Sequence, residues 1–595
     1  MNNLSLGLIG NSTTSALIDQ NASIVWWCFP YFDSNPICCR LLSPDSTGRE
    51  VGFIDVVCDN LLSTRQTYER NTAILTTVFE GRDGFIFRVT DFAPRFQQHG
   101  RLYAPATLVR IIERIEGRPR IAIRIRPVFS YGAEEPEIRS GTNHISFTGS
   151  AHPMRVTTNA ATSVILAEQL FYLNDTITLI MGPDQTVESA PREFGRSLLE
   201  QTRGYWNAWV RNLAIPFEWQ EAVIRSAITL RLNSFDDTGA IIAAVTTSIP
   251  EAANSGRNWD YRFCWLRDSY FVVSALNSMG ATGPMLRYLD YILNILADTR
   301  DAPIQPVYGI HREAILEEWE AANLFGYRMM GPVRVGNLAY LQIQNDVFGS
   351  AVLACTHAFF DTRLKQAADM GVFRDLERMG EMAIRNYDTP DAGIWELRGT
   401  KRIHTFSSLM CWAACDRLGI IAKKLGLEDR AAYWIENARM IHDEICSRAW
   451  NPELNSFVST FDGDRLDASL LLMGELRFMK PDDPRFINTI AAVEKHLQRG
   501  DYLLRYDEED DFGFPETAFI VCTFWWILAL AYIGETEKAR GLFENILSMR
   551  NHLGLLSEDL DPETGELWGN FPQTYSMVGI VMCAIRLSIP WHEAF

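Results

Sequence analysis

Two glutamates lie in loops whose compositions would give their carboxyl groups different acidities. Glu396 follows Trp395 in segment 391–399, which is rich in glycine and apolar residues and precedes a predicted helix. Apolar surroundings raise a carboxyl pKa, so Glu396 could stay protonated and act as an acid. Glu558 has polar neighbours in segment 554–565, which suit an ionised base. Cleavage of a glycosidic bond needs such a pair, although each glutamate alone is better explained as a solvated loop residue.

Segment 258–268 reads Asn-Trp-Asp-Tyr-Arg-Phe-Cys-Trp-Leu-Arg-Asp and combines four aromatic residues, two arginines and two aspartates. A core helix would place its charges on one solvated face, whereas here charges alternate with rings that favour burial. Buried arginine and aspartate must pair with each other or face a ligand. Aromatic surfaces flanked by hydrogen-bonding groups suit a sugar ring. A structural Arg–Asp pair at a helix start explains the segment equally well.

The first part of the chain is predicted to be β-structure. Segments 72–79, 85–92 and 121–127 are rich in β-branched and aromatic residues, and isoleucine alternates at 121, 123 and 125. Segment 163–173 is expected to continue this pattern. Short strands separated by regular turns are typical of an antiparallel sandwich. We therefore expect an N-terminal β-sandwich domain at residues 1–187 and a helical linker at 188–215.

After Pro216 the apolar spacing changes to three and four residues, which predicts about twelve helices. Long loops at 234–265, 300–341, 387–404, 500–515 and 550–573 separate them. Paired helices joined by long loops favour an (α/α)6 barrel over residues 216–595. The fold class is thus α+β multidomain, a sandwich followed by a barrel. Long loops in a compact domain are usually functional, and both glutamates lie in them.

Composition excludes several classes of partner. The net charge of −19 argues against nucleic acid and anionic membrane surfaces. The N-terminus lacks the basic residues followed by an apolar run that mark a signal peptide, so we expect none. No stretch of about 18 consecutive apolar residues occurs, so we expect no membrane span. Eleven cysteines are scattered without framework spacing, as in a reduced cytoplasmic protein. Since no phosphate loop or metal-ligand cluster is apparent, we expect neither cofactor nor metal.

The chain resembles glycoside hydrolase family 15, the glucoamylase and bacterial trehalase group, over nearly its full length. The opening residues 9–34 are similar to the N-terminal sandwich of its bacterial and archaeal members. The resemblance implies an (α/α)6 barrel, in agreement with the helix pattern. Five motifs carry it in family order: Asn258–Asp268, Gly331–Asn337, Gly393–Glu396, Ala518–Trp525, and Ser557–Glu558 with Gly569–Gln573.

The resemblance also implies roles for matching residues. Glu396 would be the general acid and Glu558 the general base of an inverting enzyme, with their carboxyls roughly 6.5–9.5 Å apart. The residues expected to bind the substrate are Arg267 and Asp268 at the terminal glucose, Trp265 and Trp395 as walls, Trp259, and Arg505 as a further arginine.

Two departures concern the site that holds the leaving sugar. Fungal glucoamylases carry a second acid after the general acid, where this chain has Leu397 followed by Arg398-Gly399, as in the trehalase-like branch. Met329 and Met330 are expected to narrow the pocket mouth.

We expect an inverting, exo-acting hydrolase that releases β-glucose from the non-reducing end of short α-glucosides of the maltose or isomaltose type. The alternative is an α,α-trehalase with the same catalytic pair. A disaccharide phosphorylase and a non-catalytic sugar-binding protein rank lower. The substrate would be the only partner, and the sequence leaves the oligomeric state open.

Overall fold

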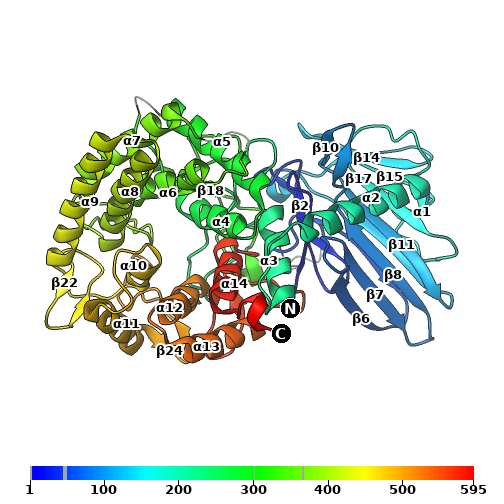
Figure 1. Cartoon of the computed structure of the whole chain (residues 1–595). Coiled ribbons are helices and arrows are strands. Elements are labelled where there is room, and N and C mark those ends of the chain that lie inside the picture. Colours follow the sequence, from blue (N-terminus) through cyan, green and yellow to red (C-terminus); the bar gives the residue numbers. More distant parts are fainter. Residues whose placement is uncertain (1–2, 44–49, 300–301, 365–367) are drawn as a thin grey trace.

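The computed structural model describes residues 3–43, 50–299, 302–364 and 368–595. A β-sandwich is followed by a long helix and then by a ring of helices (Figure 1). The predicted fold class is therefore correct. In the parts of the chain just named, no helix is both long and apolar enough to cross a membrane.

The sandwich consists of two antiparallel sheets. One has seven strands and the other eight, and apolar side chains from both meet in one core. Ile121 and Ile123 of the predicted alternating strand are buried there, because successive side chains of a strand point to opposite faces. The first sheet contains β1 (Gly7–Gly10), β2 (Ser15–Ile18), β3 (Ile24–Cys28), β4 (Pro36–Cys38), β5 (Phe53–Cys58), β12 (Arg120–Arg126) and β16 (Phe171–Tyr172). The second contains β6 (Leu61–Tyr68), β7 (Leu75–Gly81), β8 (Ile86–Phe92), β11 (Leu108–Glu116), β13 (Glu137–Ser140), β14 (His144–Thr148), β15 (Met154–Thr158) and β17 (Ile177–Pro183), while β9 (Phe96–Gln98) and β10 (Arg101–Tyr103) form a separate hairpin.

One strand prediction is wrong. Segment 163–173 begins with the short helix α1 (Thr162–Leu166) and reaches a strand only at β16. Ile165 is the buried residue of α1, so one turn of helix is enough to anchor the segment. A run of apolar and β-branched residues this short does not distinguish helix from strand by its period.

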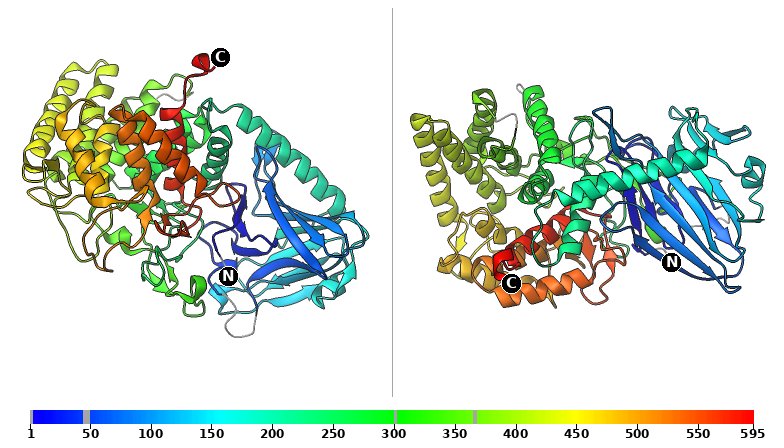
Figure 2. Two further views of the ribbon diagram at one scale, coloured as in Figure 1. Left: turned by 90° about the horizontal axis from the view of Figure 1, so that it is seen from below. Right: turned by 45° about the vertical axis from the view of Figure 1, so that its right-hand side comes forward.

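Helix α2 (Pro191–Arg211) connects the two parts and lies across the sandwich (Figure 2). Its buried stripe includes Leu198, Trp206 and Val210. Trp206 belongs to a large apolar core that also contains Trp26 of the sandwich and Ile228 of the barrel. The sandwich and barrel are thus packed through a shared core, and the division at 1–187, 188–215 and 216–595 stays a prediction.

The barrel has an inner and an outer ring of six helices each among the described residues. Neighbouring inner helices contact one another around the ring, and α14 returns to α4; between α8 and α10 the contact runs through the short 3-10 helix η4 (Ala468–Leu471). The inner α12 is buried over almost its whole length, as expected for a helix surrounded by protein. The outer α7 and α11 are amphipathic, as expected for helices that pack against protein on one side only. The inner helices are α4 (Leu266–Ser278), α6 (Asp346–Phe360), α8 (Thr405–Lys424), α10 (Leu472–Glu475), α12 (Ile520–Tyr532) and α14 (Thr574–Leu587), and the outer ones are α3 (Gln220–Leu232), α5 (Thr282–Asp298), α7 (Met370–Asn386), α9 (Glu428–Arg448), α11 (Pro484–Leu497) and α13 (Thr536–Ser548).

Short strands stiffen the long loops that enter the inner helices. The three-stranded group β26–β27–β28 is the largest of these, and it holds the chain beside Glu558. The short strands are β18 (Cys264–Trp265), β19 (Val307–Tyr308), β20 (Trp319–Glu320), β21 (Arg334–Val335), β22 (Trp450–Asn451), β23 (Ser456–Phe457), β24 (Gln498–Arg499), β25 (Tyr502–Leu503), β26 (Ala518–Phe519), β27 (Asp559–Leu560) and β28 (Leu567–Trp568).

Candidate active site

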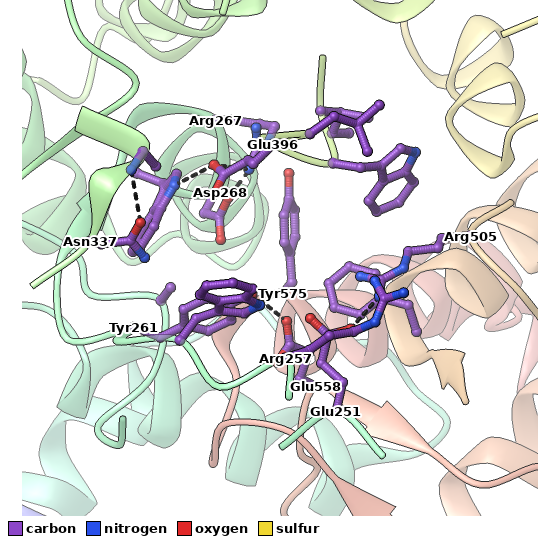
Figure 3. A pocket seen from close by; sticks show the side chains of 18 of the residues that line it. Glu251, Arg257, Tyr261, Arg267, Asp268, Asn337, Glu396, Arg505, Glu558 and Tyr575 are labelled. Carbon is purple, nitrogen blue, oxygen red and sulfur yellow. Dashed lines mark hydrogen bonds and ion pairs between the residues drawn. The ribbon is translucent and has the colours of Figure 1, made fainter. Parts of the chain in front are cut away.

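A pocket lies where loops enter the inner helices of the barrel. Its walls come from the segments that precede α4, α6, α8, α12 and α14. Its empty space is ≈ 920 Å³ when the open mouth is included. Figure 3 shows Glu396 and Glu558 on opposite sides of this space. All eight residues singled out from the sequence line it, namely Trp259, Trp265, Arg267, Asp268, Trp395, Glu396, Arg505 and Glu558.

Glu396 is held by polar side chains, and the expected apolar environment is wrong. Its Oε1 accepts hydrogen bonds from Trp265 Nε1 at 2.7 Å and from Gln344 Nε2 at 3.2 Å. Arg267 Nη2 lies 3.4 Å from the same oxygen. The backbone of Glu396 adopts a φ of 59°, a left-handed conformation that is strained for a residue with a side chain. The surrounding loop thus fixes one orientation of this carboxyl group.

Glu558 is almost completely buried and its carboxyl lies among other acids, so the expected polar surroundings that suit an ionised base are wrong. Tyr261 donates its hydroxyl hydrogen bond to Oε1 at 2.6 Å. Burial, followed by the nearby charges of Asp559 and Glu251, raises the pKa of Glu558 well above its usual value, and the bond from Tyr261 and the charge of Arg505 oppose this effect. The group would therefore be a stronger base than an ordinary glutamate once it is ionised.

Arg267 and Asp268 occupy the first turn of α4, where the helix start brings both side chains to the pocket. Arg267 Nε and Asp268 Oδ1 lie 3.5 Å apart, and neither of these two atoms makes a hydrogen bond to the described residues. Burial raises the pKa of Asp268 to about 7, against the effect of Arg267 and with that of Glu396. Both side chains line the pocket, and charged groups of this kind form strong hydrogen bonds with sugar hydroxyls.

Aromatic side chains form the walls between these charged groups. Trp395 donates its indole N–H to Asp467, which fixes the plane of the ring. Phe512 packs edge-on against Trp259 with ring centres 5.2 Å apart, and the Arg398 guanidinium lies 4.2 Å from the centre of the Trp259 ring. Rigid rings of this kind offer apolar surface to the carbon face of a sugar.

Met329 and Met330 do not belong to the pocket lining, so the expected narrowing of the mouth by these two residues is wrong. Met329 is half exposed, and Met330 is partly buried against the apolar core, where its sulfur accepts a hydrogen bond from the Asn254 amide. Arg398 and Phe512 are exposed residues that do line the pocket.

Several lining residues were missed from the sequence. Tyr261 lies inside the aromatic segment 258–268, so that signal was available. Tyr575, in the first turn of α14, carried no local signal. Glu251 and Arg257 also carried no local sequence signal, because they lie in an ordinary loop that is brought to the pocket by folding.

The sequence comparisons cover nearly the whole chain. The family model described as "Glycosyl hydrolases family 15" matches residues 219–585, and one described as "Trehalase-like, N-terminal" matches residues 3–176. A protein named trehalase from Thermoplasma volcanium is 31% identical over 98% of this chain and 93% of its own length. One of the same name from Mycobacterium tuberculosis is 30% identical over 98% of this chain and 89% of its own.

Solved structures share the fold at low sequence identity. A bacterial glucoamylase complexed with acarbose superposes with a TM-score of 0.67 at 14% identity, over 98% of this chain and 94% of that one. A single-substitution variant of a glycosidase gives a TM-score of 0.50 at 18% identity over 62% of this chain and 96% of its own. With both its domains matched and its motifs in order, the chain belongs to glycosyl hydrolase family 15 and is a glycoside hydrolase.

Proposed function

We propose that this enzyme hydrolyses α,α-trehalose to two molecules of glucose. The carrying observation is the similarity to proteins named trehalase, which extends through both the sandwich and the barrel. This similarity favours α,α-trehalose, the alternative substrate considered from the sequence, over a maltose- or isomaltose-type glucoside.

In the proposed mechanism the two carboxyl groups act from opposite sides of the attacked glucose. Glu396 gives its proton to the glycosidic oxygen as the bond from C1 to that oxygen breaks. Glu558 takes a proton from water, whose oxygen forms the new bond to C1 from the opposite face. The attacked glucose leaves as the β-anomer and the other as the α-anomer. Proton exchange with solvent then restores both carboxyl groups.

The remaining side chains would bind and orient the substrate. Arg267 and Asp268 would hold the hydroxyls of the attacked glucose from the side of the pocket that they share with Glu396. Trp265 links this side to the acid because its indole N–H bonds Glu396. Orientation of this kind contributes up to roughly 7–11 kcal/mol toward a barrier in favourable cases.

The test follows product anomers by proton NMR on trehalose, maltose and isomaltose, with and without inorganic phosphate. We expect equal initial amounts of α- and β-glucose from trehalose, independent of phosphate. Glu396→Gln should lower kcat on trehalose by about 10³-fold or more, because the proton donor is lost, and trehalose should still bind.

Other outcomes identify other functions. Release of glucose from maltose or isomaltose but not from trehalose would instead support an exo-acting hydrolase of maltose- or isomaltose-type glucosides. Glucose 1-phosphate formed only with phosphate would indicate a phosphorylase. Unchanged turnover in Glu396→Gln would contradict the assignment of the acid.

A cytoplasmic location is part of the same proposal. All eleven cysteines are free, and most of them are buried. Thiols in this state suit a reducing compartment.

A further inference from the structure

Glu251 is a nearly buried carboxylate with an unused oxygen in the pocket. Its side chain is 4% exposed and lines the cavity beside Glu558. Oε2 accepts a hydrogen bond from Arg505 Nη2, whereas Oε1 has no hydrogen-bond partner among the described residues. A carboxylate removed from bulk water is costly unless its acceptors are satisfied, so the free oxygen points to a ligand.

The segment that carries Glu251 is fixed on both sides. Its backbone carbonyl accepts a hydrogen bond from the Thr517 hydroxyl at 2.9 Å. The neighbouring Pro250 carbonyl accepts one from the Gly569 amide at 2.9 Å, in the turn that follows β28. Arg257, whose Nε is 4.0 Å from Glu251, is itself held by Asp510. The carboxylate is therefore presented by a rigid frame.

Arg505 supplies the complementary donors. It uses one nitrogen for Glu251, and its Nε and Nη1 make no hydrogen bond to the described residues. The guanidinium is 5.8 Å from the ring centre of Phe519, which belongs to the pocket wall. A free acceptor and two free donors side by side match adjacent sugar hydroxyls, each of which both donates and accepts.

The pocket thus contains two arginine–carboxylate pairs. Arg267 and Asp268 lie with Glu396 on one side, and Arg505 and Glu251 lie near Glu558 on the other (Figure 3). α,α-Trehalose consists of two identical glucoses joined through their anomeric carbons, so each half presents the same hydroxyls. Two similar pairs are what a substrate with two equal halves requires.

We propose that Glu251, paired with Arg505, binds the hydroxyls of the leaving glucose and thereby determines specificity for a second sugar. This inference rests on the proposed trehalase activity, in which Arg267 and Asp268 hold the attacked glucose. Glu251 takes no part in proton transfer. Its effect is confined to substrates that carry a leaving sugar.

The test compares trehalose with α-glucosyl fluoride, whose leaving group is a fluoride ion with no hydroxyls. Each enzyme is measured at its own pH optimum, because Glu251 also influences the acidity of Glu558. Glu251→Gln should lower kcat/KM on trehalose by about 10- to 100-fold, mainly through KM. On α-glucosyl fluoride kcat/KM should stay within about 3-fold of the unmodified enzyme. Glu218→Gln, which breaks a Glu–Arg pair with Arg540 outside the pocket, should change neither.

The outcomes separate the inference from the function on which it rests. Equal losses on both substrates would overturn the inference and place Glu251 with the attacked glucose or the base. Hydrolysis of the fluoride but not of trehalose by the unmodified enzyme would overturn the proposed function and this inference together. If Glu251→Gln does not fold, Glu251→Asp keeps the charge beside Arg505 but withdraws the free oxygen, and it should show the same selective loss.

Discussion

At the scale of single residues, the acidity of the site depends on how closely carboxyl groups are placed. Glu558 and Asp559 are consecutive, and both are buried. Burial and the neighbouring acids raise the pKa of both. Activity should therefore fall on the acid side at a higher pH than an isolated glutamate would give, because only the ionised form of Glu558 accepts a proton.

Asp559→Asn should shift the loss of activity on the acid side of the pH profile, called the acid limb below, to lower pH. Removing the negative charge of Asp559 takes away one cause of the raised pKa of Glu558, so Glu558 ionises at lower pH. The measurement is kcat/KM on trehalose as a function of pH. Glu563→Gln, which removes an exposed acid in the following turn, serves as control and should leave the limb in place. A limb that stays fixed in Asp559→Asn, or moves upward, would contradict this coupling.

What the sequence could reveal about these residues depended on how local the signal was. Arg267 and Asp268 were found because aromatic and charged residues are concentrated in one short segment. The surroundings of Glu396 were predicted wrongly because Gln344 and Trp265 arrive from distant parts of the chain. Glu251 was missed for the same reason, because its place in the pocket depends on contact with Arg505, which is distant in the sequence.

At the scale of elements, the turn after β28 fixes the position of the proposed base. Gly569 has a φ of 73°, and a Cβ there would lie 2.6 Å from Glu558 Cβ and 2.8 Å from its Oε2. Gly569→Ala should therefore displace the carboxylate and lower kcat by about 10-fold or more. Trehalose turnover and thermal unfolding are measured on the same preparation.

Gly565 provides a matched control in the hairpin between β27 and β28. Its φ of 72° is nearly the same, but the one atom within reach of a Cβ there is the Met549 sulfur, at 3.1 Å. Gly565→Ala should carry a similar backbone cost of roughly 1–2 kcal/mol in stability and keep its kcat. Equal losses of kcat in both variants would attribute the effect to general destabilisation.

The helices themselves were largely predictable, because their apolar period is long and regular. About twelve helices were expected after Pro216, and the described residues form twelve α-helices there, α3 to α14. The short elements were not. Segment 163–173 holds too few residues for its period to decide between helix and strand, and contacts with the sheet decide instead.

At the scale of the whole molecule, a buried ion cluster joins the sandwich to the barrel. Asp236, in the loop after α3, lies 2.6 Å from Arg95, which follows β8 in the sandwich. Arg231 of α3 and Arg287 of α5 contact the same carboxylate. Burial alone would raise the pKa of Asp236, but the three guanidinium groups outweigh it and lower the pKa from 3.8 to about 2.

Asp236→Asn should destabilise the protein by ~3–5 kcal/mol near neutral pH, because it leaves buried arginines without a counter-charge. A carboxylate with a lowered pKa adds stability above its unfolded value of 3.8, and this contribution is lost as the pH falls through about 2. The difference in unfolding free energy between the original protein and Asp236→Asn should thus be constant above about pH 4 and shrink below it. Urea unfolding of both proteins at pH values above and below about 4 measures this difference in unfolding free energy. Asp462→Asn, which breaks an exposed pair with Arg448, should cost at most about 1 kcal/mol. A gap of that small size for Asp236→Asn as well would mean that the apolar core, rather than this ion cluster, holds the two parts together.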